Sequence, residues 1–402
     1  MILFTGASQV VTCETADEGA VLQRTAVAVA DGLIAAVGPE PELADRWPDA
    51  ERVDCHAGVL TPGLVDAHSH AVFGRWRADE YALRSRGVPY MEIARRGGGI
   101  NASVRDLRAR SEDELVELTR ERLRDVVALG TTTLEVKSGY GLTTDDELKM
   151  LRVIRRLDRE GPLDLVPTFL GAHETPLEYR DRKDAYVALV VEEMIPAVAE
   201  TGLARFCDVF MEPGVFDAAQ SRRILEAGLE HGLVPKLHAD ELEPSGGAEL
   251  AAALGAASAD HLGAISDAGI AALAASETVA TLLPGTLFFL GRTRYAPARA
   301  LLDAGATVAL ATDFNPGSSA SPSLPLAMTI ACSQMAMSPL EAIHAATRGG
   351  ARALRLQDGR GTLRVGAPAD LVLWRAADYR EIPYRYGVRL ARSVWKRGRP
   401  VA

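Results

Sequence analysis

Two histidines separated by one residue, His68 and His70, follow an apolar run and form the most chemically suggestive pair in the chain. On a strand, residues i and i+2 point to the same side, so both imidazoles can reach one metal ion. His238 and Asp313 end two later apolar runs. Nitrogen and carboxylate ligands without thiolate suit zinc, iron or manganese, in a site with a position open for water. We therefore predict a hydrolytic metal centre, in which Asp313 also accepts a hydrogen bond from the attacking water.

Three further side chains near these runs are candidates for proton transfer or substrate binding. Glu241 and His261 are suited to moving protons, although a solvated loop carboxylate and a packed rim histidine are the plain alternatives. Arg77 follows the histidine pair and can bind a substrate carboxylate. A surface ion pair of Arg77 with Asp79 or Glu80 is the competing interpretation, which the spacing favours.

The middle of the chain alternates strand-length apolar runs with helical patterns such as Glu112–Leu129, Asp146–Glu160, Asp184–Glu200 and Ala218–His231. The expected strands are Leu60–His70, Thr131–Lys137, Leu163–His173, Arg205–Glu212, Leu233–Asp240, Ala257–Leu262, Thr278–Leu283 and Thr307–Asp313. Eight such units predict a (β/α)8 TIM barrel, whose active site lies at the carboxyl ends of its strands. A doubly wound open sheet is the alternative, but no GxGxxG loop follows the first strand.

Both ends of the chain have the character of short strands. Ala26–Gly38 has two apolar runs around an Asp-Gly turn, which predicts a hairpin. Gly361–Trp374 and Val388–Ala402 are apolar runs punctuated by Gly and Pro. We predict a small β-sandwich domain built from both termini, residues 1–59 and 362–402, around a catalytic barrel of residues 60–361.

The composition limits the partners and the compartment. The 402 residues carry a formal net charge of −10, which disfavours nucleic acid and anionic lipid as partners. The four cysteines lie far apart with no CxxC, which argues against a thiolate zinc site and a disulfide framework. The first residues lack the features of a signal peptide, and no run of about 18 apolar residues occurs. We predict a cytoplasmic enzyme without nucleic-acid or membrane partners.

A set of motifs, in this order, resembles the imidazolonepropionases of the amidohydrolase superfamily. They are TPGLVDAHSH, RADEY, GGGI, EVKSGYG, ELKMLR, TFLGAH, KLHADEL, SADHL and ATDFNPGSS. HxH with a late His and Asp marks only the superfamily, whereas KSGYG, LGAH and DxNPG are more specific to the family.

The resemblance implies hydrolysis of the cyclic amide of 4-imidazolone-5-propanoate to N-formimidoyl-L-glutamate, a step of histidine degradation. It implies one zinc or iron ion held by His68, His70, His238 and Asp313, with His261 helping to activate water. The substrate, a small molecule with a carboxylate, would be contacted by Arg77, Tyr140, His173, Glu241, Asn315, Gly317 and Ser318.

Several details depart from the family or bear on the number of ions. AVFGRW stands between the histidine pair and Arg77, and Glu174 follows His173, where the family has other residues more often. The fourth strand offers Asp208 and Glu212 but no lysine, which favours one ion per chain and leaves a weak second site at Glu212 open. Because dimers are common among barrel enzymes, we expect a homodimer.

Three other functions compete with this interpretation. A related amidohydrolase acting on another ring, such as a nucleobase deaminase or a formimidoylglutamate deiminase, would share the metal ligands and differ in the loops. A catalytically silent scaffold would usually lose ligands, all four of which are present. An NAD-dependent oxidoreductase lacks its glycine loop here.

Overall fold

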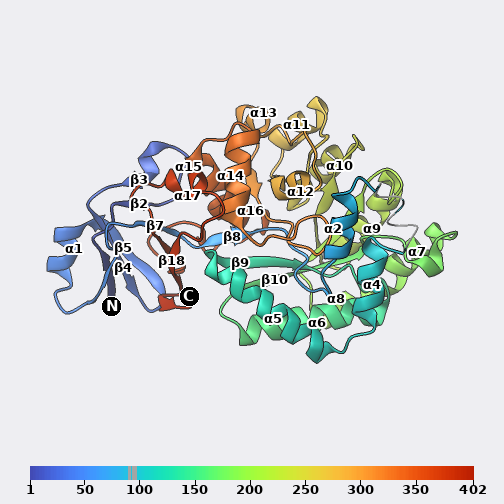
Figure 1. Cartoon of the computed structure of the whole chain (residues 1–402), viewed down its shortest axis with the longest axis horizontal. Coiled ribbons are helices and arrows are strands. Elements are labelled where there is room, and N and C mark those ends of the chain that lie inside the picture. The colour runs from blue at the N-terminus through green and yellow to red at the C-terminus, as the bar shows by residue number, and fades with distance from the viewer. Residues whose placement is uncertain (89–91, 93–96) are drawn as a thin grey trace.

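Eight parallel strands from the middle of the chain pair side by side in a nearly closed barrel in the computed structural model, which describes residues 1–88, 92 and 97–402 (Figure 1). They are β8 (Leu64–Asp66), β9 (Thr131–Lys137), β10 (Asp164–Ala172), β11 (Phe206–Met211), β12 with β13 (Val234–Pro235 and Leu237–Ala239), β14 (Ser258–His261), β15 (Val279–Leu282) and β16 (Val308–Leu310). Past the ends of β8 and β16, the His70 N–H donates to the Phe314 carbonyl at 2.9 Å. The predicted barrel is confirmed.

The first predicted strand, Leu60–His70, is wrong as one continuous element. Its start is β7 (Val59–Pro62), which pairs with the terminal strands β2 (Gln9–Val11) and β17 (Leu371–Trp374), and only β8 joins the barrel. Between them, a Cβ on Gly63 would lie 2.2 Å from Oγ1 of Thr132. A residue without a side chain therefore lets the chain pass from one sheet to the other, which an apolar run alone does not reveal.

The two ends of the chain form two packed sheets, as predicted. One sheet has the order β5-β4-β1-β6 and the other β19-β18-β17-β7-β2-β3. Their remaining strands are β1 (Ile2–Thr5), β3 (Val21–Leu22), β4 (Thr25–Ala30), β5 (Leu33–Pro39), β6 (Glu51–Asp54), β18 (Ala391–Lys396) and β19 (Arg399–Pro400). Phe4 and Val27 of the first sheet share a buried core with Leu60 and Leu371 of the second. The exact division at residues 59/60 and 361/362 stays a prediction.

The Asp-Gly hairpin forms where the sequence predicts it. β4 and β5 pair antiparallel, and the turn between them has Asp31 at φ +51° and Gly32 at φ +78°. This pair of positive φ angles is typical of the two-residue turns that match strand twist.

The predicted helices begin at clear caps. Ser111 caps α5 (Glu112–Ala128), and Asp217 caps α9 (Ala218–Glu230), each as part of a capping box. Thr143 caps α6 (Thr144–Glu160) by accepting from the Asp146 N–H. Each of these helices lies within two residues of its expected bounds.

The expected helix Asp184–Glu200 is interrupted. The chain forms α7 (Lys183–Leu189), a π-helical turn η3 (Val190–Met194) and α8 (Ile195–Thr201). Pro196 stands in the first turn of α8 and has no N–H, so the regular ladder is lost at this point.

The remaining helices of the described residues complete the barrel and the terminal sheets. They are η1 (Glu18–Ala20), α1 (Glu40–Arg46), α2 (Ala78–Arg84), α4 (Ile100–Arg108), η2 (Leu177–Tyr179), α10 (Gly247–Ala253), α11 (Asp267–Ala274), α12 (Pro284–Phe289), α13 (Ala298–Asp303), α14 (Leu324–Gln334), α15 (Pro339–His344), η4 (Ala345–Gly349), α16 (Gly350–Ala353) and α17 (Glu381–Tyr384). Among the described residues, no helix has the length and apolar character to cross a membrane.

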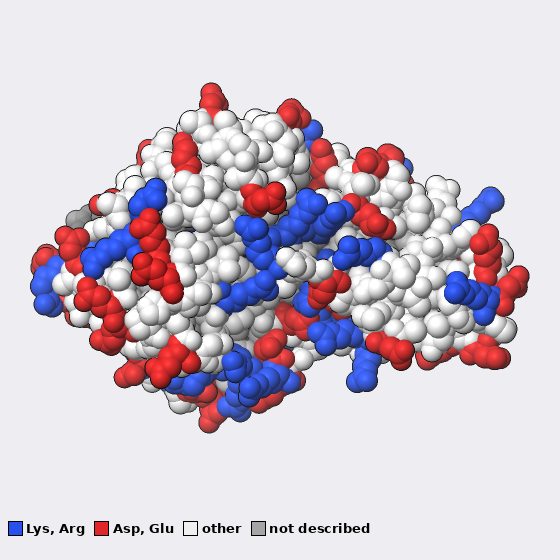
Figure 2. Space-filling view, turned by 180° about the vertical axis from the view of Figure 1, so that it is seen from behind, with Lys and Arg blue, Asp and Glu red and all other residues white. Residues whose placement is uncertain are grey.

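Charges of both signs are interspersed over the face drawn in Figure 2. Lys and Arg gather there near the waist between the barrel and the terminal sheets, with Asp and Glu among them. The absence of a nucleic-acid partner stays a prediction, as does the cytoplasmic location.

Candidate active site

The four predicted metal ligands come from three strand ends and converge at the carboxyl end of the barrel. His68 and His70 follow β8, His238 lies in β13, and Asp313 follows β16. Oδ1 of Asp313 lies 3.5 Å from Nε2 of His68 and 3.4 Å from Nε2 of His70. The ring centroids of His68 and His238 are 4.5 Å apart. All four side chains are buried.

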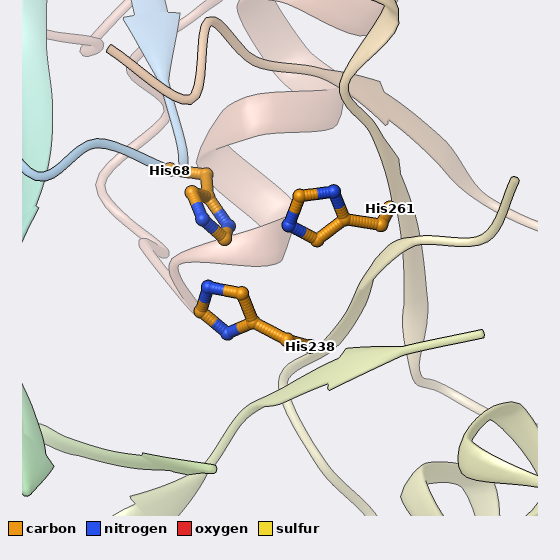
Figure 3. A group of neighbouring side chains, drawn as sticks. All are labelled: His68, His238 and His261. Atoms are coloured by element: carbon orange, nitrogen blue, oxygen red, sulfur yellow. The ribbon is translucent and has the colours of Figure 1, made fainter. Parts of the chain in front are cut away.

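His68 belongs to two groups of potential ligands. Its ligand atom lies within 4.8 Å of those of His70 and Asp313, and also within 4.8 Å of those of His238 and His261. Figure 3 shows the rings of His68, His238 and His261 directed toward a common space. His261 therefore belongs to the same group of potential ligands as the predicted ligand His238.

The donor set fits a divalent ion. Nε2 of His68 and Nε2 of His238 are buried and have no hydrogen-bond partner among the described residues. Unpaired buried nitrogens are costly unless a ligand satisfies them. Burial lowers the pKa of His238 well below its ordinary value, despite the opposing effect of Asp208, and so favours the neutral imidazole that binds metal. Neutral imidazoles with one carboxylate suit zinc or iron.

Two buried carboxylates lie beside two of these imidazoles. Oδ2 of Asp260 lies 2.6 Å from Nδ1 of His68, and Oδ2 of Asp208 lies 3.1 Å from Nδ1 of His238. The hydrogen bond of His68 Nδ1–H to Asp260 leaves the Nε2 lone pair of His68 free for a metal, whereas Asp208 lies beside His238 as a charged neighbour. In the sequence, Asp260 lies in the SADHL motif and Asp208 in the fourth expected strand, and no local pattern indicates their place beside the imidazoles.

A buried ammonium joins these carboxylates. Nζ of Lys137 lies 2.7 Å from Oδ2 of Asp208, 2.7 Å from Oε1 of Glu135 and 3.6 Å from Oδ2 of Asp260. A second ammonium, on Lys236, lies 3.6 Å from Asp260. None of these five side chains is exposed to solvent. Burial would lower the pKa of Lys137, but the carboxylates, Asp208 first, raise it above its ordinary value. Lys137 begins the KSGYG motif, and nothing in the motif itself indicates this buried contact.

Asp313 is held by its neighbours in a left-handed backbone conformation, at φ +50°. Its Oδ2 accepts from Oγ1 of Thr286 at 2.6 Å, a contact from α12 that no local pattern indicates. Burial would raise the pKa of this carboxyl, but the neighbouring imidazoles of His68 and His70 outweigh burial and hold the pKa well below its usual range. Asp313 is therefore ionised.

Glu241 and His261 lie side by side at the rim. Nδ1 of His261 is 3.8 Å from Oε2 of Glu241, and both side chains are largely buried. Burial raises the pKa of Glu241, which favours its protonated form more than in an exposed carboxyl. The carboxylate of Glu212 accepts hydrogen bonds from the backbone N–H groups of Glu241, Leu242 and Glu243, and so supports the loop that carries Glu241.

Arg77 forms the ion pair that its spacing favours, and it also lies beside the turn that follows Asp313. Its Nε lies 3.2 Å from Oε2 of Glu80, the expected ion pair, yet the side chain is buried rather than at the surface. A Cβ on Gly317 would lie 2.0 Å from Nη2 of Arg77. The guanidinium therefore packs directly on the turn after Asp313.

The other predicted substrate contacts surround the histidines. The ring of His173 stacks on that of His70, with 4.9 Å between centroids. The ring centroids of Tyr140 and His173 are 5.4 Å apart. Asn315 accepts from the N–H groups of Gly317 and Ser318 and donates to Oγ of Ser318 and the carbonyl of Asp313. Its hydrogen-bonding capacity is filled within the turn, so here Asn315 shapes the turn. Substrate contact by these residues stays a prediction.

A nearly closed parallel barrel with buried imidazoles and an aspartate at its carboxyl end, joined to two sheets from the termini, defines a metal-dependent hydrolase of the amidohydrolase type. A family model described as "Amidohydrolase family" matches residues 96–402. A second model, "Imidazolonepropionase-like composite domain, bacteria", matches residues 26–50. The chain belongs to the imidazolonepropionase family of these amidohydrolases.

Curated relatives extend over nearly the whole chain. The imidazolonepropionase of Symbiobacterium thermophilum is 49% identical, covering 99% of this chain and 96% of that protein. That of Geobacillus kaustophilus is 49% identical, covering 95% and 91%, and that of Myxococcus xanthus is 50% identical, covering 93% and 89%.

Solved structures share the fold at low identity. An adenosine deaminase from Xanthomonas campestris with bound zinc has a TM-score of 0.73 and 21% identity, covering 99% of this chain and 92% of that chain. A guanine deaminase from C. acetobutylicum with bound guanine has a TM-score of 0.71 and 16% identity, covering 100% and 99%.

Proposed function

We propose that this chain hydrolyses the cyclic amide C–N bond of 4-imidazolone-5-propanoate to give N-formimidoyl-L-glutamate in histidine degradation. The observation that carries the proposal is the convergence of His68, His70, His238 and Asp313 at the mouth of the barrel. Identity of 49% to imidazolonepropionases over nearly the full length supports the choice of substrate.

These four side chains would hold one zinc or iron ion. Such an ion would supply hydroxide at neutral pH. The connected buried network contains three carboxylates, on Glu135, Asp208 and Asp260, and two ammonium groups, on Lys137 and Lys236. Its net charge of −1, added to that of Asp313, is balanced by a single divalent cation, which supports one ion per chain.

The chain's own groups then move the protons. The Asp313 carboxylate accepts a hydrogen bond from the attacking water and holds it toward the ring carbonyl. His261 helps to remove the proton from this water. Glu241, whose pKa is raised by burial, is placed beside His261 to deliver a proton to the departing ring nitrogen.

Substrate binding follows from charge and shape. The Arg77 guanidinium pairs with the propionate carboxylate. Tyr140 and His173, whose rings lie against each other, contact the substrate ring in this proposal, and the turn that contains Asn315, Gly317 and Ser318 lies beside the guanidinium.

A direct assay tests the proposal. Purified protein is mixed with 4-imidazolone-5-propanoate, consumption is followed by its ultraviolet absorbance, and N-formimidoyl-L-glutamate is identified by mass spectrometry. Elemental analysis of the same preparation counts zinc and iron, and light scattering after gel filtration tests the expected homodimer. A metal-loaded protein that leaves the imidazolone unchanged would refute the proposal.

A further inference from the structure

The turn after β9, residues 138–142, is bound by one buried carboxylate that plays no part in the proposed chemistry. Glu147, in the first turns of α6, is not exposed to solvent. Its carboxylate accepts hydrogen bonds from the backbone N–H groups of Gly139 at 3.0 Å, Gly141 at 2.8 Å and Leu142 at 2.8 Å. A group that only accepts thus satisfies three donors of a single turn.

This turn needs such support. Leu142 has φ +54° and Gly139 has φ +103°, the left-handed region in which a residue with a side chain is strained. A Cβ on Gly141 would lie 2.5 Å from the backbone nitrogen of Glu147, so the turn sits directly on the start of α6. The hydrogen bonds to Glu147 offset the strain and hold the turn in this shape.

The same turn carries or contacts two of the residues predicted to bind substrate. It carries Tyr140, and the carbonyl of Gly139 lies 3.0 Å from Nδ1 of His173. Because a carbonyl can only accept, Nδ1 of His173 carries the proton. In the neutral ring with its proton on Nδ1, Nε2 is a hydrogen-bond acceptor.

We propose that Glu147 is a positioning residue, which through the turn of residues 138–142 places Tyr140 and fixes His173 as a hydrogen-bond acceptor toward the substrate. The proposal rests on the proposed function and refines its substrate class. The group that meets Nε2 of His173 must be a donor, as the ring N–H of a cyclic amide is. A ring that presents only acceptors at this position leaves Nε2 unpaired and is rejected.

The tautomer of His173 tests this inference without any turnover. Nitrogen chemical shifts of ¹⁵N-histidine-labelled full-length enzyme identify the protonated ring nitrogen, and His173→Asn assigns the signal. We expect a protonated Nδ1 in the wild type and a shift of the tautomer population in Glu147→Ala, with a smaller shift in Glu147→Gln, whose amide keeps one acceptor oxygen. If both variants keep the tautomer population of the wild type, the inference is overturned.

Kinetics separate positioning from general stability. We expect KM to rise about tenfold or more in Glu147→Gln, with kcat within about threefold of the wild type and the bound metal unchanged, because substrate contacts and not metal ligands are displaced. Glu160→Gln is the matched control, at the other end of α6, where the side chain is exposed and pairs with Arg156; its KM should equal that of the wild type.

Each result has a distinct consequence. If Glu147→Gln keeps the wild-type KM, the positioning role is contradicted. It is also contradicted if kcat and bound metal fall equally while KM does not rise. If Glu147→Ala fails to fold, the nearly isosteric Glu147→Gln decides the question. An inactive wild type would refute the proposed substrate, whereas the NMR result on His173 would still stand or fall by itself.

Discussion

Asp260 and His68 meet at 2.6 Å between Oδ2 and Nδ1, and neither side chain is exposed to solvent. The two residues are 192 positions apart in the chain, and Asp260 directly precedes His261, another histidine of the site. One strand end therefore supplies both a pocket imidazole and the carboxylate that orients a proposed ligand on another strand.

Replacing Asp260 by Asn should weaken metal binding by about 10- to 100-fold, because a neutral amide is a poorer acceptor for the His68 proton. Titration with zinc against a chromophoric chelator measures the affinity. Asp267→Asn, on the exposed start of α11, serves as the control and should bind zinc as the wild type does. Equal affinity in both variants would remove Asp260 from the support of the metal centre.

Replacing Lys137 by Met should destabilise the metal-free protein by about 3–5 kcal/mol, because the buried Asp208 loses its ammonium partner at 2.7 Å and Glu135 keeps only that of Lys236, at 3.7 Å. Adding Asp208→Asn should restore part of the loss, since one of the unpaired charges is then removed. Urea unfolding of the wild type, both single variants and the double variant completes the cycle. Strict additivity of the two changes would show that the pair is not coupled.

Much of the fold could be predicted because its signals are local. Apolar runs of strand length, helical periodicity and the Asp31-Gly32 turn each depend on a few neighbouring residues. The break at Gly63 could not be predicted, because it arises from the approach of Thr132, which is distant in the chain. The π-helical turn before Pro196 had a local signal in the proline itself.

Some residues of the candidate site could likewise be predicted from the sequence, and others could not. The spacing of His68 and His70 on a strand indicates a metal site, and the end of a later strand predicts where Asp313 lies. Lys137 and Glu147 look like ordinary charged residues in the sequence, and only the closed barrel shows that both are fully buried among specific partners. Buried polar networks depend on contacts between distant elements, so spacing cannot reveal them.

Replacing Asp313 by Ala should abolish turnover and reduce bound metal well below one equivalent per chain. The change removes a proposed ligand together with the acceptor for the attacking water, and it leaves Oγ1 of Thr286 without its partner. Elemental analysis and the imidazolone assay are run on the same preparation. Full turnover in this variant would exclude Asp313 from the site.

Replacing Gly317 by Ala should raise KM by about 10- to 100-fold with metal content unchanged, because the added methyl would lie 2.0 Å from Nη2 of Arg77 and displace the guanidinium from its place. Gly38→Ala is the control, since its Cβ would lie 3.8 Å from the nearest atom, in the terminal sheets. Steady-state kinetics on both variants, and on Arg77→Ala, test whether the guanidinium binds the substrate. If Arg77→Ala keeps the wild-type KM, the carboxylate is bound elsewhere.

Stability should also depend on His344 at mildly acidic pH. Burial, with the nearby Arg348 and Arg352, lowers the pKa of this half-buried imidazole to about 4, whereas an unfolded histidine titrates near 6.5. The folded state therefore binds fewer protons between these values, and the contribution is complete above about pH 6.5 and is lost as pH falls toward 4. At pH 5 the loss reaches up to about 2 kcal/mol. In His344→Gln, the decrease in unfolding free energy from pH 7 to pH 5, measured on the metal-free protein, should be smaller than in the wild type by that amount. Parallel pH profiles for the two proteins would show that His344 keeps an ordinary pKa.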